Sequence, residues 1–216
     1  QSALSRAAGL GSLENGMPGV LKLLSYNSQA AIGTSSYHHY VTRSWRNVVP
    51  HSKTSQILNQ IAHIVSDYDV VALQEADGGS LRSRFVNQIE YLAEYGGFEV
   101  WHQQLNRDFG RLGQFSNGLL SRYTPYLIEN HKLPGLRGRG AIVAMFGHPD
   151  NPLVLVGLHL ALGERARNKQ LEYVCDVVRQ YEYVVVMGDM NCRSDQLMHS
   201  PLKGTRLVPA LQTHPT

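Results

Sequence analysis

The sequence predicts an α/β fold in which two sheets pack together and helices cover their outer faces. Apolar runs of strand length alternate with longer stretches in which apolar residues recur every three or four positions, the spacing of an amphipathic helix. Strand–helix–strand units come first, a run of strands follows, and a helix and a strand close the pattern. The chain has 216 residues and 43% hydrophobic content, which is enough for one sizeable core.

The first strand is predicted over residues 20–24, followed by a helix over 54–66 and a strand over 70–74. A helix over 83–95 should end at Gly96 and Gly97, because glycine readily adopts the left-handed conformation that terminates helices. Five strands are then expected, over residues 98–102, 118–121, 126–131, 141–146 and 153–160. A helix over 164–180 and a strand over 183–187 complete the pattern.

Four of these apolar strands have a polar or ionisable residue at their C-terminal end: Asn27, Glu75, His159 and Asp189. Ligands of α/β sheets gather at the carboxyl ends of strands, so the four ends together describe a site. Asp189 and Asn191 stand two residues apart and should point to the same side of an extended chain. A carboxylate beside a carboxamide suits a hydrated metal ion or a phosphoryl oxygen. The alternative is an ordinary strand-to-turn junction, where Gly, Asp and Asn are common for backbone reasons.

In their order and rough spacing, these motifs resemble the endonuclease/exonuclease/phosphatase superfamily, which has a deoxyribonuclease I-like fold. The matching segments are Ser-Tyr-Asn27, Leu-Gln-Glu75, Leu-His159-Leu and Gly-Asp189-Met-Asn191. Two weaker matches are the strand from Ser116 to Arg122, which contains Asn117, and the Arg139-Gly140-Ala141 strand start. The resemblance runs from about Val20 to the end of the chain. It implies a four-layer α/β sandwich with two central mixed sheets and helices outside.

The resemblance also implies a divalent-metal-dependent phosphoesterase. Glu75 would hold the metal, with Asn27 beside it, and Mg²⁺ is expected because hard oxygen ligands suit it; Mn²⁺ is a plausible substitute. Asp189 would orient or deprotonate the attacking water, and Asn191 would hold a phosphate oxygen. His159 would donate a hydrogen bond to the phosphate or a proton to the leaving group. Arg139 and Asn117 match positions expected near the substrate phosphate.

His159 favours the branch that contains deoxyribonuclease I, neutral sphingomyelinases and inositol polyphosphate phosphatases. The Tyr-x-Pro-Asn segment of abasic-site endonucleases is absent from the sequence. The resemblance therefore implies a phosphate-ester substrate and leaves nucleic acid, a phospholipid head group and a small ester open. A non-catalytic binding or scaffold relative of the same fold is the alternative function.

The end of the sequence departs from the family pattern, in which an Asp-His pair forms the last motif. His199 and His214 follow Asn191, and neither is preceded by Asp. We therefore expect residues 17–216 to form a single catalytic domain whose C-terminal part is missing, with His214 as a less favoured substitute for the family's last histidine. Residues 1–16 are expected to be an extension that is flexible or of non-native origin, or alternatively a short helix.

Composition narrows the remaining classes. The formal charge of +3 is only mildly basic and does not by itself indicate nucleic acid. Most of the arginines between Arg82 and Arg139 are expected on a solvated surface. Two cysteines are too few for a disulfide framework, and Cys192 is interpreted as a neighbour of the metal motif. No run reaches membrane-spanning length, no secretory signal is visible and nothing points to a protein partner, so a cytoplasmic location is the default expectation.

Overall fold

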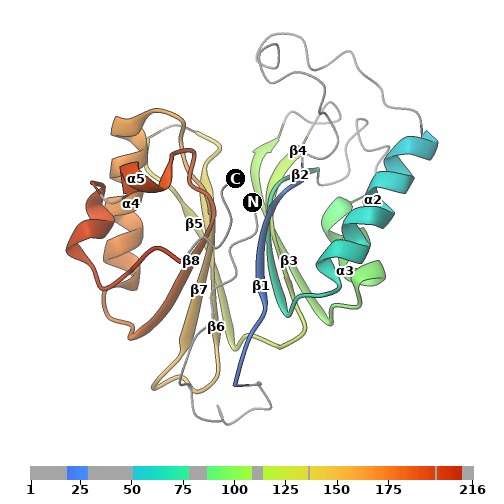
Figure 1. Ribbon diagram of the computed structural model, residues 1–216, viewed down its shortest axis with the longest axis horizontal. Coiled ribbons are helices and arrows are strands. Elements are labelled where there is room, and N and C mark those ends of the chain that lie inside the picture. Colours follow the sequence, from blue (N-terminus) through green and yellow to red (C-terminus); the bar gives the residue numbers. More distant parts are fainter. Residues whose placement is uncertain are drawn as a thin grey trace.

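The computed structural model describes residues 19–28, 51–77, 87–108, 114–135, 137–197 and 199–210. Two four-stranded sheets lie face to face, and helices cover their outer faces, which gives four layers (Figure 1). The expected α/β sandwich with two mixed sheets is thereby confirmed. The predicted extension over residues 1–16 and the histidine His214 lie outside the described residues.

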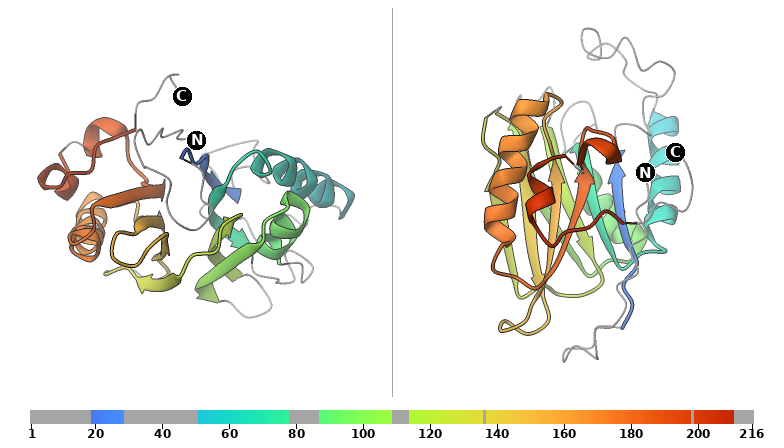
Figure 2. Two further views of the ribbon diagram at one scale, coloured as in Figure 1. Left: turned by 90° about the horizontal axis from the view of Figure 1, so that it is seen from below. Right: turned by 60° about the vertical axis from the view of Figure 1, so that its left-hand side comes forward.

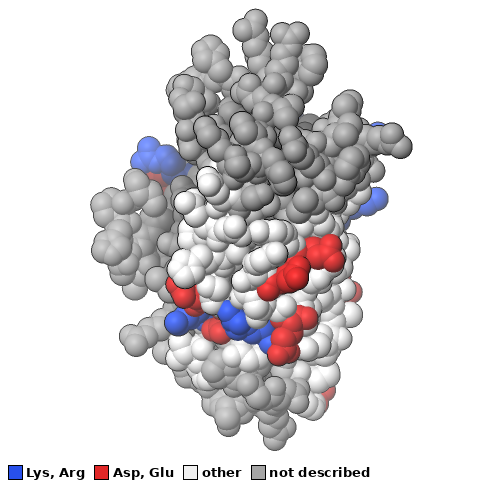
Figure 3. Space-filling view, turned by 90° about the vertical axis from the view of Figure 1, so that its right-hand side faces the viewer, with Lys and Arg blue, Asp and Glu red and all other residues white. Residues whose placement is uncertain are grey.

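The first sheet has the strand order β1-β2-β4-β3 and contains both parallel and antiparallel pairs. Its strands are β1 (Leu23–Asn27), β2 (Val70–Asp77), β3 (Val100–Asp108) and β4 (Gln114–Ser121). β1 and β2 are parallel, whereas β4 runs antiparallel to both β2 and β3. Helices α2 (His51–Val65) and α3 (Gln88–Gly96) cover the outer face of this sheet. Acidic and basic residues lie side by side on that flank of the molecule (Figure 3).

The second sheet has the order β5-β6-β7-β8. Its strands are β5 (Leu127–Lys132), β6 (Gly140–Phe146), β7 (Leu153–His159) and β8 (Tyr183–Asp189). β7 and β8 are parallel and the other pairs are antiparallel. Helix α4 (Glu164–Val178) covers the outer face, and the short elements α5 (Ser194–Leu197) and η3 (Pro201–Gly204) follow. Every residue of β6 and β7 is buried, as expected for strands covered on both faces.

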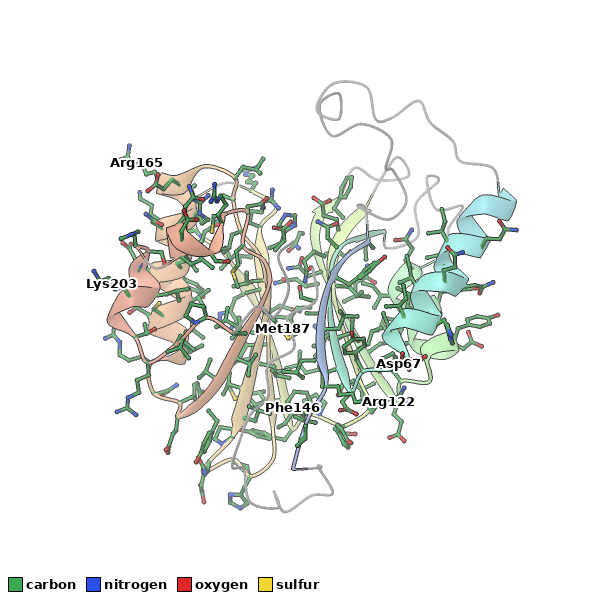
Figure 4. The ribbon with its side chains drawn as sticks, in the orientation of Figure 1. Asp67, Arg122, Phe146, Arg165, Met187 and Lys203 are labelled. Atoms are coloured by element: carbon green, nitrogen blue, oxygen red, sulfur yellow. The ribbon has the colours of Figure 1, made fainter. Side chains whose placement is uncertain are left out.

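The central core lies between the two sheets. Strand side chains alternate between faces, so every second residue of each strand points toward the opposite sheet. Phe146 and Met187 lie between the sheets in Figure 4 and belong to this apolar layer, with Leu23, Ala72 and Leu155. Two further apolar clusters lie beneath α2 and α3 and beneath α4.

Several element boundaries differ from the expected ones. Helix α3 begins at Gln88, because Asn87 adopts an extended conformation and its side chain accepts hydrogen bonds from the N–H groups of Ile89 and Glu90. The expected helix start at residue 83 lies outside the described residues. Its end is as predicted: Gly97 has a φ of 71° and caps the helix. β2 and β3 each run past their expected ends, to Asp77 and Asp108. In the described part of the chain, no helix has the length and apolar character needed to cross a membrane.

Candidate active site

The candidate site forms where two pairs of parallel strands end at the same edge of the sandwich. Asn27 of β1 pairs with Gln74 of β2, and His159 of β7 pairs with Asp189 of β8. β1 and β8 are edge strands of different sheets, yet they lie next to each other (Figures 1 and 2). The Asn27 Nδ2 atom donates a hydrogen bond to Asp189 Oδ2 at 3.2 Å, which joins the two strand ends directly.

His159 stands between the two carboxylates. Its Nε2 atom lies 3.8 Å from Asp189 Oδ2 and 3.9 Å from Glu75 Oε1. The histidine side chain is 7% exposed, whereas the side chains of Glu75 and Asp189 are 32% and 31% exposed. Four of the predicted site residues, Asn27, Glu75, His159 and Asp189, therefore meet at one place with their carboxylates open to solvent.

The polar site continues the faces that carry the central core. Each polar residue stands two positions after another residue of its strand: Asn27 after Ser25, Gln74 after Ala72, and Asp189 after Met187. Ala72 and Met187 belong to the apolar layer between the sheets. Because successive side chains alternate, residues two apart point the same way. The layer between the sheets thus changes from apolar to polar between one inward-facing residue and the next, from Ala72 to Gln74 and from Met187 to Asp189.

Gly188 is required by close packing rather than by a turn alone. Its φ is 142°, and a Cβ atom at this position would overlap the backbone of Leu158 on the neighbouring strand β7. A residue with a side chain would push β8 away from β7 just before Asp189. The glycine of the Gly-Asp-Met-Asn motif therefore keeps Asp189 beside His159.

The expectation that Asp189 and Asn191 lie on one extended segment is wrong. β8 ends at Asp189, and Asn191 has a left-handed φ of 49°. The turn aims the Asn191 backbone N–H at Asp189 Oδ1, 2.9 Å away, and the Asn191 side-chain amide donates to the Leu160 carbonyl at 2.7 Å. Asn191 therefore fixes one carboxylate oxygen of Asp189, and Asn27 donates to the other.

Glu75 also has an unusual backbone. Its φ is 57°, and the pairing of β2 with β4 shifts register between Leu73 and Ala76, as at a β-bulge. Within the described residues, Glu75 and Asn191 are the non-glycine residues with positive φ. The left-handed conformation is unfavourable for a residue such as Glu, and backbone strain of this kind clusters at functional sites. Neither conformation was predicted from the sequence.

Gln74 forms the buried floor of the site and had no predicted role. It is 1% exposed, and its side chain accepts a hydrogen bond from Ser25 Oγ at 3.2 Å and donates to the Ala72 carbonyl at 3.1 Å. Ser28 Oγ donates to the Gln74 carbonyl at 3.1 Å. One sequence signal could have indicated a polar contact here. Ser25 and Asn27 are two positions apart, so both lie on the face of β1 that carries Leu23, and a buried polar side chain on that face needs a partner such as Gln74.

Asn117 lies between the sheets and is 2% exposed. Its Nδ2 atom donates to the Gly140 carbonyl at 2.9 Å and to Gln104 Oε1 at 3.4 Å. Both amide hydrogens are thus used within the protein, so a phosphate contact would have to replace one of these bonds. The Arg139 carbonyl accepts from the Leu133 N–H at 3.0 Å, which closes the loop between β5 and β6. The phosphate roles of Asn117 and Arg139 stay predictions.

The two carboxylates of the site offer the oxygen ligands that a hard divalent cation takes in proteins. Among the described residues, no group of three or more His, Cys, Asp or Glu side chains is arranged to hold a metal. Zinc is held by three or four such ligands, whereas Mg²⁺ keeps several waters and binds through one or two carboxylates plus substrate phosphates. Two partly exposed carboxylates meet that need. Burial raises the pKa of the Cys192 thiol above its ordinary value, which disfavours the thiolate that a metal would require.

Similarity to known proteins concerns the family and the fold of the chain. A family model described as the Endonuclease/Exonuclease/phosphatase family matches residues 50–215. No curated protein matches the chain. D. rerio TDP2, humanized by 14 mutations, superposes with a TM-score of 0.55 at 18% identity, covering 82% of this chain and 65% of that one.

Two further solved structures are similar. D. rerio TDP2 complexed with a single-strand DNA product gives a TM-score of 0.54 at 18% identity, covering 82% of this chain and 63% of that one. An endonuclease/exonuclease/phosphatase from Bacteroides vulgatus gives 0.57 at 15% identity, covering 84% and 72%. The chain thus spans about two thirds of the length of these proteins, and at such identities the likeness shows a shared fold. With the family model matching most of its length, the chain belongs to the endonuclease/exonuclease/phosphatase family.

Proposed function

We propose that the chain is a phosphoesterase that depends on a divalent metal, Mg²⁺ by preference and Mn²⁺ as a substitute. The observation that carries the proposal is the meeting of Glu75, His159 and Asp189, in which one imidazole nitrogen lies within 4 Å of both carboxylates. Two carboxylates that approach the same imidazole nitrogen concentrate negative charge, so the site favours a cation beside them. The exposed side of the carboxylates leaves room for waters and a phosphate.

The roles of the side chains follow from their contacts. Glu75 would hold the metal, with Asn27 beside it. A bound Mg²⁺ polarises a phosphoryl oxygen and offsets the charge that builds in the transition state. Asp189 has its oxygens oriented by the Asn27 and Asn191 donors, so it would direct a water and accept its proton.

His159 and Asn191 would act on the substrate. The buried His159 would donate a hydrogen bond from Nε2 to a phosphate oxygen or a proton to the leaving group. One hydrogen of the Asn191 amide is held by the Leu160 carbonyl, which fixes the group and aims its second hydrogen. That second hydrogen would hold a phosphate oxygen. Preorganised donors of this kind need little rearrangement during the reaction.

The substrate class is a phosphate ester. The TDP2 structure that holds a single-strand DNA product makes a DNA phosphodiester one candidate. A phospholipid head group and a small phosphate ester are the others. Arg139 and Asn117 remain proposed phosphate contacts.

The test uses Glu75→Gln, which keeps the shape of the side chain and removes its charge. Plasmid DNA, sphingomyelin and bis-p-nitrophenyl phosphate are incubated with the wild-type chain, with Mg²⁺ and with EDTA. We expect hydrolysis of at least one substrate that needs the metal, and a loss of about 10²-fold or more in the variant. Glu99→Gln is the matched control, because Glu99 is an exposed carboxylate that directly precedes β3 of the first sheet. Unchanged hydrolysis by a folded Glu75→Gln variant would rule out Glu75 as the metal ligand.

A further inference from the structure

Helix α4 carries an arginine that is buried close to the candidate site. Arg167 is 5% exposed, although it lies in the first half of a helix on the outside of the second sheet. Its neighbour Arg165 is exposed and extends outward from the same helix in Figure 4. Arginine is seldom buried without partners, so the contacts of Arg167 indicate what its burial achieves.

One guanidinium nitrogen of Arg167 joins two loops at the carboxyl edge of the second sheet. Its Nη1 atom donates to the Leu162 carbonyl at 2.9 Å and to the Asn191 carbonyl at 3.1 Å. Leu162 lies in the connection from β7 to α4, which follows His159. Asn191 lies in the connection from β8 to α5, which follows Asp189. The helix thus holds together the two loops that leave the catalytic strands.

Arg167 acts on Asp189 indirectly, because Asn191 is hydrogen-bonded to both residues. In Asn191 both backbone polar groups and one hydrogen of the side-chain amide are hydrogen-bonded. Its carbonyl accepts from Arg167, its N–H donates to Asp189 Oδ1, and its side-chain amide donates to the Leu160 carbonyl. Rotation of the Asn191 backbone toward an ordinary conformation would break these bonds and release the Asp189 carboxylate.

A second buried side chain of α4 provides a useful contrast. Gln170 is fully buried; it accepts a hydrogen bond from the Ala161 N–H at 2.8 Å and donates to the Pro134 carbonyl at 3.1 Å. It therefore braces the connection after β7 against the loop between β5 and β6. Of these two braces, Arg167 is the one that reaches the connection after Asp189. The Arg167 charge also acts on that connection, because it partly offsets the rise in the pKa of the Cys192 thiol.

We propose that Arg167 is a positioning residue of the phosphoesterase site. Its guanidinium holds the Asn191 carbonyl so that Asn191 stays left-handed and its N–H keeps one oxygen of Asp189 in place. The proposal deepens the proposed function and rests on it. Partners that orient the groups around a metal commonly contribute 10- to 100-fold in metal affinity or activity.

The variants are Arg167→Met, which keeps much of the length and removes the donors, and Arg167→Lys, which keeps the charge but loses the fork. Arg165→Met is the matched control on the same helix. The conformation of Asn191 is followed by NMR on protein labelled with ¹³C-carbonyl Met and ¹⁵N-Asn. The Met-Asn dipeptide occurs once in the wild-type sequence, at Met190-Asn191, so the pair of labels selects one amide there, in Arg167→Lys and in Arg165→Met. In Arg167→Met, Asn168 also follows a methionine, and its additional signal is identified by its loss in the double variant Arg167→Met, Asn168→Gln. Mn²⁺ binding is measured by electron paramagnetic resonance. The values of kcat and KM are measured with bis-p-nitrophenyl phosphate as the substrate.

In Arg167→Met we expect a shifted or broadened Asn191 amide signal, and Mn²⁺ affinity or kcat lower by about 10- to 100-fold with KM within about twofold. Arg167→Lys should fall between this variant and the wild type, and Arg165→Met should match the wild type in every measurement. If Arg167→Met does not fold, the same measurements on Arg167→Lys test the proposal. An unmoved Asn191 signal with wild-type Mn²⁺ affinity in a folded Arg167 variant would overturn the proposal. A wild-type chain that binds no Mn²⁺ and hydrolyses no substrate would refute the proposed function instead, and the Asn191 signal would still decide whether Arg167 sets that loop.

Discussion

Arg122 is predicted to be a major source of stability, because its guanidinium bonds carbonyls at the C-terminal ends of two helices. Its acceptors are the carbonyls of Ser66 at 2.6 Å, Gly97 at 2.8 Å, Tyr68 at 3.1 Å and Gly96 at 3.2 Å. Ser66 follows the last turn of α2, and Gly96 and Gly97 end α3. These carbonyls lack partners within their helices and carry partial negative charge, which a cation neutralises.

The expected cost of Arg122→Met follows from these contacts. Three of the four hydrogen bonds are partly buried, whereas water can reach the Gly97 carbonyl. At about 1 to 1.5 kcal/mol for each partly buried bond, the free energy of unfolding should fall by about 3 to 5 kcal/mol. The guanidinium also lies 5.0 Å from the centre of the Phe98 ring, which favours the upper part of that range. Arg122 and Asp67 mark this corner of the molecule in Figure 4.

The assay is equilibrium unfolding in urea. Arg179→Met is the matched control, since the Arg179 guanidinium also has a hydrogen-bond partner, the Asp176 carboxylate, but both side chains are largely exposed. That variant should lose less than about 1 kcal/mol, as exposed pairs do. Arg122→Lys should lie between the two, because a single ammonium reaches fewer carbonyls than the fork does. If Arg122→Met and Arg179→Met unfold at the same urea concentration, the carbonyls are adequately hydrated by water and the reasoning fails.

Three further predictions concern the site. Asp189→Asn should lose about 10²- to 10⁴-fold in hydrolysis yet keep its stability within about 1 kcal/mol, because Asn27 can turn its amide to accept from the new group; Asp189→Ala should be less stable by a further 1 to 3 kcal/mol, roughly, because the Asn27 and Asn191 donors lose their acceptor. Equal urea midpoints for these two variants would contradict this. Glu75→Gly should be more stable than Glu75→Ala by about 1 kcal/mol, since glycine tolerates the left-handed φ of 57°, and equal stabilities would show that the position is unstrained. Burial raises the pKa of the Cys192 thiol, so the folded protein favours the protonated thiol. Alkylation of Cys192 by iodoacetamide should therefore be slower than that of a free thiol below about pH 9, and the free energy of unfolding should fall as pH rises through the folded pKa. An alkylation rate equal to that of an unfolded control would disprove the burial.

The strand ends were predictable because their signal is local. An apolar run followed by a polar residue marks both the strand and its exposed end, and parallel strands bring such ends to one edge. Asn27, Glu75, His159 and Asp189 were found in this way, and the structure brings them together. The two sheets and their covering helices followed from the same alternation of periods.

The backbone and the braces were not predictable, because they depend on contacts between distant segments. Glu75 adopts its left-handed conformation at a register shift between β2 and β4, and the residue types around it do not indicate such a shift. Arg122 was expected on a solvated surface, but its acceptors come from segments 25 to 56 residues away in sequence. Arg167 lies four residues before Leu171 on the buried face of α4, but an arginine is usually exposed, and its acceptors belong to other segments of the chain.

The closeness of core and site explains how a small set of polar groups keeps its geometry. Asp189 lies two residues beyond Met187, and Gln74 lies two residues beyond Ala72. Each of these polar side chains therefore lies on the same strand face as a residue that is packed in the apolar layer between the sheets. Side chains supported by packed neighbours hold a productive geometry better than side chains on loops. Asn191 has left the strand and has no such support, and this is the residue whose carbonyl Arg167 holds. The fold therefore positions Asp189 from the core on one side and from helix α4 on the other.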